Sequence, residues 1–363
     1  MTSTTTSRLA ITATLMSLIV ILEGCGGGGG SAPAPAPAPA PTPTPAPVPA
    51  PAPGPAGDLS STIAPTTYTA SGREALAYQA LNSVRQAGGF GTVAQNSALD
   101  SEAVNQAAFV AANYTIASGF GGLDWNAVTL AALQPDGTET GHDQTLSNLP
   151  GYTGYSPTAR AVHFGYATSP VVAEDASFFT AMTAPANGTS CVTDLLRSPG
   201  HRENLLDPRF RDVGIGYSTL SQPFDSSNAT LFGQSCYFAT AAKVGTYSST
   251  GLATAPSGWI GIYPADASTV SSTNNSHGHG FAPSVTVDSN LALITTTFTV
   301  VDSNGNTVPT TLNVDAQSKG YANWAFATPN AALALNTTYT VNFVGTAGGK
   351  AVTKTWTFTT PAQ

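Results

Sequence analysis

The stretch SPGHRENLLDPRFRDVGIGY, Ser198–Tyr217, differs in composition from the rest of the chain. Charged residues make up only 9% of the sequence, yet this stretch and the residue before it gather several of them around His201. They are Arg197, Arg202, Glu203, Asp207, Arg209, Arg211 and Asp212. The stretch ends in apolar residues interrupted by glycine, a pattern that predicts a strand. Such polarity in a weakly charged chain marks His201 as a candidate site residue.

Length and charge narrow the classes of protein to consider. With 363 residues, the chain is long enough for two domains. Its formal net charge is −8 and its sequence pI is about 4.9. An acidic chain without a basic run offers no surface for nucleic acid or for anionic lipid headgroups. We therefore expect no nucleic-acid partner.

The N-terminus is predicted to be a targeting segment. One arginine, Arg8, precedes the apolar run LAITATLMSLIVIL at residues 9–22. This run is shorter than the roughly 20 residues that a membrane span needs, and it suits a signal peptide. The following LEGC resembles a bacterial lipobox, which implies residues 1–24 as a lipoprotein signal peptide and Cys25 as the lipidated residue. Cleavage of an ordinary signal peptide nearby is the alternative.

A Gly-rich and then Ala-Pro-rich segment occupies residues 25–65. Alternating Ala and Pro favour an extended polyproline II backbone, which acts as a semi-rigid spacer of about 3.1 Å per residue. Directly after a lipid anchor, such a segment is expected to be a disordered stalk that holds the rest of the chain away from a membrane.

The cysteines support export. Cys25 is accounted for by the lipobox, which leaves Cys191 and Cys236. An even pair in an exported chain predicts a disulfide, and two buried free thiols are the alternative. No CxxC motif is present, so neither a redox centre nor a zinc cluster of cysteines is expected.

Between residues 66 and 250, helical patterns come first and strand patterns later. Apolar spacing predicts helices at residues 72–89, which end at the glycine pair, and at 96–114, with Asn96 or Ser97 as the cap. Short helical stretches are expected at 173–182 and 191–196, and His201 is expected in a turn. Strands are predicted for DVGIGYSTL and FGQSCYFATAAKV. This order predicts an α+β domain.

Four segments of this region together resemble the CAP superfamily of cysteine-rich secretory proteins, antigen 5 and pathogenesis-related proteins, and its bacterial lipoprotein branch in particular. These segments are LNSVRQAGG with Asn82 and Arg85, GHDQTLSNLPGYTGYSPTARAVHFGY with Arg160, VVAEDASFF, and LLRSPGHRENLLDPRFRDVGIGY. The resemblance implies a CAP-type α-β-α sandwich at residues 66–250. It covers about half of the chain.

The resemblance also implies a site. By position, the family's cleft would contain His142, Glu174 and His201, which would be the catalytic residues of an enzyme. Two neutral imidazoles can bind a divalent metal such as zinc, and a carboxylate nearby can accept a proton from its water. His142 and His201 are therefore the expected metal ligands. The family's second glutamate has no clear equivalent, and Asp194 is the nearest acid.

The C-terminal part, residues 251–363, has a different pattern. Alternation predicts that Ile294, Thr296, Phe298 and Val300 share one face of a strand, before a turn at residues 304–305. A second hairpin is predicted to turn at residues 348–349. This all-β pattern resembles the bacterial Ig-like β-sandwich. The SHGHG segment, with His277 and His279, is expected to be a polar loop.

Two functions remain open from the sequence. The chain is either an envelope protein that binds a lipid, peptide or cell-wall fragment in its cleft, or a metal-assisted hydrolase that uses His142, Glu174 and His201. A spacer with a vestigial cleft is a third interpretation. Whether the protein is an enzyme is left open, and zinc or another divalent cation is the only cofactor considered.

Overall fold

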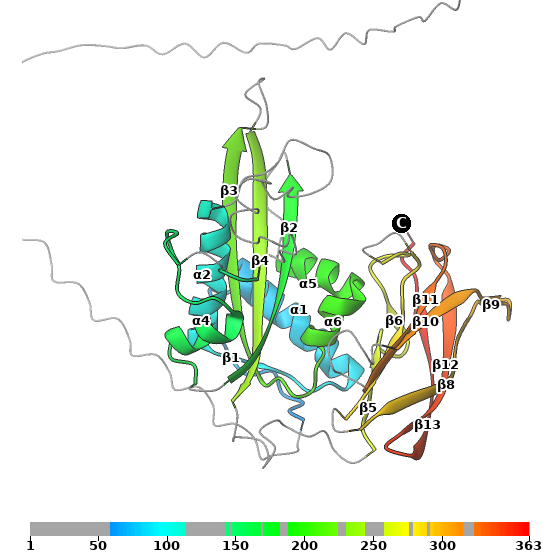
Figure 1. The fold of residues 1–363 in the computed structure, drawn as a ribbon. Coiled ribbons are helices and arrows are strands. Elements are labelled where there is room, and N and C mark those ends of the chain that lie inside the picture. The colour runs from blue at the N-terminus through cyan, green and yellow to red at the C-terminus, as the bar shows by residue number, and fades with distance from the viewer. Residues whose placement is uncertain are drawn as a thin grey trace, which may run out of the picture. The chain divides into compact units, whose positions relative to one another are not determined.

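The computed structural model describes most of the chain from Leu59 onward (Figure 1). The described residues are 59–113, 142–144, 147–167, 170–181, 188–223, 230–243, 258–275, 279–288, 291–314 and 323–362. The predicted signal peptide, the lipidation site at Cys25 and most of the predicted linker lie outside these ranges. Residues up to 243 are called the α/β region below, and residues from 258 onward the β region.

The α/β region is built around a four-stranded sheet with the order β1-β3-β4-β2. Its strands are β1 (Ala94–Gln95), β2 (Pro170–Ala181), β3 (Asp212–Pro223) and β4 (Thr230–Lys243). The two long central ladders, β2 with β4 and β3 with β4, are antiparallel, and the short β1 pairs with β3 in parallel. β2 is an edge strand of this sheet, and its side chains point alternately to the two faces of the sheet.

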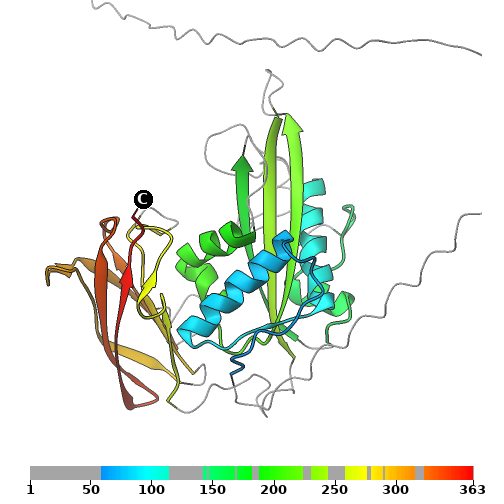
Figure 2. The ribbon, with the colours of Figure 1, turned by 180° about the vertical axis from the view of Figure 1, so that it is seen from behind.

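Helices cover both faces of this sheet, as Figures 1 and 2 show. Helices α2 (Ser97–Asn113) and α4 (Pro157–His163) lie on one face. Helices α1 (Arg73–Gly88), α5 (Gly188–Arg197) and α6 (Pro199–Leu205) lie on the other. Each face has its own buried core, one with Leu99 and Ala103 and the other with Leu81 and Leu195. This three-layer arrangement confirms the α+β fold class.

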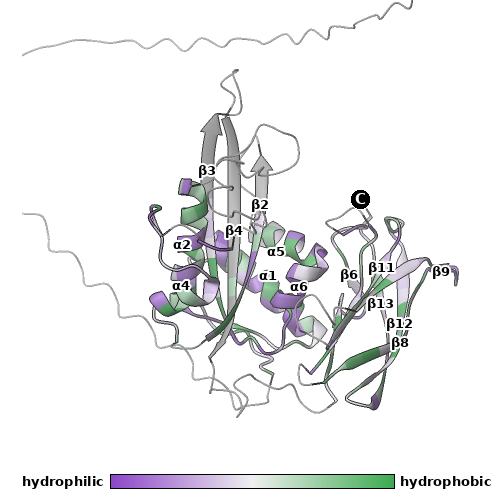
Figure 3. Cartoon of the chain, viewed as in Figure 1, coloured by the Kyte–Doolittle hydropathy of each residue, from purple (hydrophilic) through white to green (hydrophobic). Residues whose placement is uncertain are grey.

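The first two helices begin and end where the sequence predicts. Gly89 takes a left-handed conformation after α1, with φ of 80°, and its N–H bonds to the carbonyl of Gln86. A glycine adopts this conformation without the steric cost of a Cβ. Before α2, the side-chain oxygen of Asn96 accepts a hydrogen bond from the N–H of Ala98. Both helices carry hydrophobic and hydrophilic residues, as expected for elements between a sheet and solvent (Figure 3).

The helix expected at residues 173–182 is wrong. Residues Pro170–Ala181 form strand β2, which pairs with β4 from Pro170↔Lys243 to Ala181↔Phe232. Alanine and glutamate favour a helix only weakly, and a long antiparallel ladder overrides that preference. Glu174 therefore lies in a strand rather than at a helix start. The short helix expected at 191–196 is confirmed as α5.

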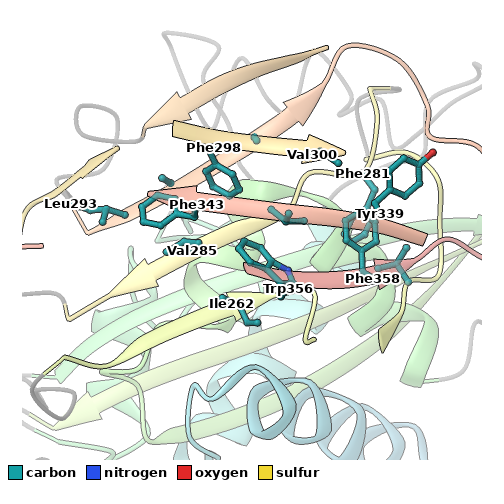
Figure 4. Packing of buried hydrophobic residues seen from close by; sticks show 14 of the residues in the cluster. Ile262, Phe281, Val285, Leu293, Phe298, Val300, Tyr339, Phe343, Trp356 and Phe358 are labelled. Carbon is teal, nitrogen blue, oxygen red and sulfur yellow. The ribbon is translucent and has the colours of Figure 1, made fainter. Parts of the chain in front are cut away.

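The β region consists of two sheets. Their strand orders are β10-β11-β7-β5 and β6-β13-β12-β8-β9. The bounds are β5 (Ile260–Tyr263), β6 (Ser268–Thr269), β7 (Ser284–Val287), β8 (Leu293–Val301), β9 (Thr307–Val308), β10 (Thr310–Val314), β11 (Trp324–Pro329), β12 (Thr338–Ala347) and β13 (Lys350–Thr359). Buried residues of both sheets share one core, which includes Phe298, Phe343, Trp356 and Phe358 (Figure 4).

Both hairpins of the β region are confirmed. β8 pairs with β9 around the turn at residues 302–306, and β12 pairs with β13 around Gly348 and Gly349. The expected strand face is wrong at its start, because Ile294 is 64% exposed whereas Phe298 and Val300 are buried. The pairing shifts between Val344 and Gly345, so one extra residue of β8 sits opposite this step. Such a bulge turns the preceding side chains to the other face.

The two regions belong to one compact unit that ends at Gln363. The indole N–H of Trp259 donates to the carbonyl of Gly89 at 2.7 Å, and the Phe90 and Trp259 rings meet edge to face. Trp259 and Tyr263 also pack against the core between α1 and the sheet. The domain boundary at residue 251 and the Ig-like assignment of the β region stay predictions.

Candidate functional site

Strand β2 sends its two adjacent acids in opposite directions. Successive side chains of a strand point to opposite faces of the sheet. Glu174 points toward α2 and α4, where it meets Arg160. Asp175 accepts a hydrogen bond from Asn204, close to the end of α6, at 3.2 Å. The two carboxyl groups therefore belong to different layers of the molecule.

Glu174 contacts His142 directly. Nδ1 of His142 lies 2.8 Å from Oε1 of Glu174. The glutamate side chain is only 1% exposed, whereas that of His142 is 23% exposed. This contact turns the Nδ1 side of the imidazole toward the buried carboxylate. A buried carboxylate of this kind fixes the orientation and the tautomer of an imidazole.

Arg160 connects this pair to the scaffold. Its guanidinium is fully buried and donates to Glu174 Oε2 at 2.6 Å and to Glu102 Oε1 at 2.8 Å. It also donates to the backbone carbonyl of His142 at 2.8 Å. One arginine on α4 thus holds the carboxylate and the backbone of the histidine at the same time.

Glu102 on α2 was not among the residues that the sequence predicted for the site. It lies on the buried side of α2, close to Leu99 and Ala103. An acid on the apolar face of a helix is a signal that the sequence does contain, because such a group is buried only when it is paired. Glu102 is therefore part of the support for Glu174.

Burial raises the pKa of both carboxyl groups. For Glu102, burial and then the charge of Glu174 raise the pKa well above its ordinary 4.5, against the opposing effect of Arg160. For Glu174, burial also raises the pKa, and the charge of Arg160 is the largest effect that opposes this rise. One guanidinium cannot balance two ionised carboxylates, so the pair favours retention of a proton, with Glu102 as the more strongly shifted partner.

A buried amide network positions the segment that carries His142. Gln144 is fully buried, and its side-chain N–H groups donate to Asn105 and Gln106 of α2, each at 3.0 Å. Its side-chain oxygen accepts from the N–H of Thr153 at 2.8 Å. These bonds tie residues 142–144 to α2 and to the loop before α4. Gln144 was not among the residues that the sequence predicted for the site.

His201 lies on helix α6 rather than in the turn that was expected. Ser198 precedes the helix and Pro199 occupies its first turn, a position that suits proline because its missing N–H is not needed there. α6 belongs to the layer opposite α2 and α4, although it packs near the edge strand β2. The convergence of His142 and His201 in one cleft therefore stays a prediction.

Arg85 of α1 holds the backbone of the polar stretch that follows His201. Arg85 of α1 is fully buried, and its guanidinium donates to the carbonyls of Leu205, Asp207 and Phe210. It also donates to two carbonyls just after α1, those of Phe90 and Gly91. Burial lowers the pKa of Arg85 to about 9, so the side chain keeps its charge at neutral pH.

The arginines of this stretch take different partners. Arg209 pairs with Asp207. Arg202 donates instead to the carbonyl of Ala282 in the β region, and its guanidinium lies 4.7 Å from the centre of the Tyr263 ring. Asp194, considered as the second acid, accepts a hydrogen bond from Ser177 at 2.6 Å. His163 is exposed at the end of α4, with its ring against Phe164.

Within the described ranges, no group of three or more His, Cys, Asp and Glu side chains is close enough to hold a metal ion. His142 fits the role of a single ligand, with a carboxylate behind its ring. A second ligand at His201 and zinc binding stay proposals. Residue His277 of the SHGHG segment lies outside the described residues.

Comparison with known proteins identifies the family of the α/β region. Residues 78–238 match the model of the cysteine-rich secretory protein family, CAP. The matched range includes His142, Glu174 and His201. A search of curated proteins found no match. In the part of the chain that the structure describes, the helices fall short of the length and apolarity that a membrane crossing requires.

Proposed function

Because residues 78–238 form a CAP domain, a domain of cysteine-rich secretory proteins, we propose that this chain is an exported protein that binds a small ligand at His142 and Glu174. The ligand classes considered are a lipid, a peptide and a cell-wall fragment. We further propose that Cys25 carries a lipid anchor and that residues 25–65 form a stalk, which would place the domain in a bacterial cell envelope.

One observation carries the proposal of a site. The partly exposed imidazole of His142 is fixed by the buried carboxylate of Glu174, which is itself held by Arg160. A chain of contacts from an imidazole to a buried carboxylate and on to a buried guanidinium is more than a purely structural histidine requires. The arrangement holds a partly exposed imidazole in one orientation, and an imidazole can donate to or accept from a bound polar group.

The residues around His142 favour binding over hydrolysis. The imidazole of His142, backed by Glu174, has the geometry of a general base. However, the buried side chains that hold this pair, Arg160 and Glu102, bond to each other and, through Arg160, to Glu174 and so serve to fix the pair in place. A metal-assisted hydrolase remains the alternative, in which a bound divalent cation would supply Lewis acidity and His142 with His201 would hold it.

The experiment compares binding by three single variants of the full chain. A fluorescent long-chain fatty acid and a muramyl dipeptide serve as lipid and cell-wall probes, and an unrelated tripeptide as the peptide probe. We expect at least one probe to bind the wild type. His142→Ala and Glu174→Gln should weaken that binding at least tenfold, and His163→Ala, an exposed histidine of the same domain, should not.

Absence of binding by every probe, or equal binding by all three variants, would contradict the proposal. A calorimetric zinc titration tests the alternative. Zinc affinity should fall as the pH drops through about 6.5, because a protonated imidazole cannot bind a metal. His201→Ala should abolish zinc binding, and hydrolysis of an ester substrate should require both zinc and Glu174.

A further inference from the structure

A second pocket lies away from His142 and Glu174. Its volume is about 710 Å³, within the range of sites for small ligands. Pro199 and Gly200 at the start of α6 line one side of it. Residues of the β region line the rest, and they include His279 of the SHGHG segment, which the proposed function does not use.

The lining of this pocket combines polar groups with a larger apolar surface, and its described residues carry no charge. It contains the amides of Asn275 and Asn330, the hydroxyls of Thr311 and Thr328, and the ring of Phe326. None of the described residues that line it is Asp, Glu, Lys or Arg. A charged ligand would therefore find no counter-ion among the described lining residues, whereas a ligand with both an apolar face and polar groups would find partners for each.

The outer face of one sheet provides the floor of the pocket. Along β11, Ala325 and Ala327 point into the core of the β region, so Phe326 and Thr328 point to the opposite face. Thr311 of β10 lies beside Thr328 in the ladder. The half-buried ring of Phe326 packs on Trp324, with 4.5 Å between ring centres. An aromatic ring flanked by hydroxyls is thus held on a rigid strand.

The polar groups of the pocket are already positioned. The hydroxyl of Thr311 donates to the side-chain oxygen of Asn330 at 2.9 Å. This bond orients the amide and leaves its N–H groups without a hydrogen-bond partner among the described residues. Asn275 exchanges two hydrogen bonds with the backbone of His279, which closes the loop between them. Arg197 of α5 donates to the carbonyl of Asn275 and so supports that loop.

We propose that this pocket binds a neutral oligosaccharide. A sugar ring presents an apolar C–H face and a rim of hydroxyl groups. The Phe326 ring matches that face, and the amides of Asn330 and Asn275, the threonine hydroxyls and His279 match the rim. The preorganised amide and loop reduce the entropy lost on binding. This site is independent of the one proposed at His142.

The test is calorimetric titration of the full chain with maltotriose and triacetylchitotriose, which are neutral, and with trigalacturonate, which is anionic. At least one neutral trisaccharide should bind in a saturable way, and trigalacturonate should bind at least tenfold more weakly. The double variant Thr311→Val/Asn330→Leu changes two exposed side chains and should weaken neutral-sugar binding at least tenfold. Thr297→Val, an exposed threonine on β8 outside the pocket, is the matched control.

Binding that is equal in the double variant and in Thr297→Val would overturn the proposal, as would the absence of neutral-sugar binding at millimolar concentration. Preference for the anionic sugar, or displacement of the neutral sugar by an extended peptide, would also overturn it. Thermal unfolding of each variant shows whether a loss reflects misfolding; if the double variant is unfolded, Phe326→Leu takes its place. His142→Ala should leave the sugar affinity unchanged, which separates this result from the proposed function.

Discussion

Arg85, Arg160 and Arg202 lose nearly all exposure to solvent, and each has a different set of partners. Arg85 donates only to backbone carbonyls, five in all. Arg160 pairs with two carboxyl groups. Arg202 makes one hydrogen bond across to Ala282 and lies against aromatic rings. At the scale of single residues, buried cations therefore organise the ends of helices, the site and the contact with the β region.

Replacement of Arg85 by lysine should destabilise the protein strongly. Lysine keeps the charge, but it has three donors on a single nitrogen and cannot span carbonyls on two separate loops. Orphaned carbonyls and a badly placed buried charge should cost about 3 kcal/mol or more in the free energy of unfolding. Urea unfolding measures this loss. Arg73→Lys, at a partly exposed arginine of the same helix, should cost under about 1 kcal/mol; equal losses would contradict the role given to Arg85.

Glu102 should make stability depend on pH. Its pKa is raised in the folded chain, mainly by burial and then by Glu174, above the 4.5 expected when unfolded. The unfolded chain therefore releases this proton first as the pH rises. The contribution is complete below about pH 4.5 and is lost as the pH rises from there through the folded pKa.

Glu102→Gln removes that titration but keeps a side-chain oxygen for Arg160. Between pH 4.5 and 7, the wild type should lose more of its free energy of unfolding than this variant does. Urea unfolding at a series of pH values gives the two slopes. If the slopes are the same, Glu102 does not hold the extra proton. Asp302→Asn is the matched control, because Asp302 lies in an exposed turn and its pKa is lowered rather than raised.

At the scale of elements, two glycines decide how closely α2 approaches the sheet. A Cβ added at Gly214 would lie 2.0 Å from the backbone of Leu99, and one at Gly216 would lie 2.2 Å from the backbone of Ala103. Real Cβ atoms do not come so close to backbone, so the helix could rest here only on glycine. Because α2 also carries Glu102, this close approach helps to position Glu102 relative to the sheet.

Gly216→Ala should therefore destabilise the protein although it adds only one methyl group. The methyl would have to push α2 away from β3, and overpacking of this kind costs about 1–3 kcal/mol. Chemical unfolding measures the loss. Ser218→Ala, two residues along the same strand, should change stability by less than about 0.5 kcal/mol. An unchanged free energy of unfolding in Gly216→Ala would contradict this, because it would mean that α2 can move away from β3 without cost.

A disulfide between α5 and β4 stays a proposal at this scale. It is supported by the burial of Cys191 in α5 and by the sequence, which leaves Cys236 as the expected partner. The bond would close a loop of about 45 residues and stabilise the fold by about 3–4 kcal/mol in the chain-entropy model. Thiol titration of the denatured, unreduced protein should find neither thiol free. Two free thiols would rule out the pairing.

At the scale of the whole molecule, the β region has a core of its own but shares its boundary with the CAP domain. Among the described residues, Phe298, Phe343 and Trp356 belong to a core formed by the β region. Trp259 and Tyr263, in contrast, also contact the core around α1. A fragment from Ala255 onward should therefore fold cooperatively, with a lower melting temperature than the same region in the full chain.

Calorimetric unfolding of that fragment and of the full chain measures the difference. Trp259→Ala in the full chain should reproduce part of the loss, because it removes the bond to Gly89 and the contact with Phe90. A fragment without a cooperative transition would mean that the β region depends on the CAP domain to fold.

The sequence by itself determined the features that depend on neighbours along the chain. Helices α1 and α2 follow from apolar spacing and from their flanking Gly89 and Asn96, because capping is satisfied within a few residues. The two hairpins follow from turn residues for the same reason. The family resemblance also pointed to His142, Glu174 and Arg160, because it depends on the order of motifs along the chain rather than on local structural preference.

Only the tertiary structure decided what depends on partners far away in the chain. Residues 170–181 form a strand because β4 pairs with them, and Ile294 is exposed because β12 imposes a bulge on β8. Glu102 joins the site because α2 brings it to Arg160, 58 positions later. Strand pairing and the compensation of buried charge are satisfied between distant segments, so the pattern of any one segment does not contain them.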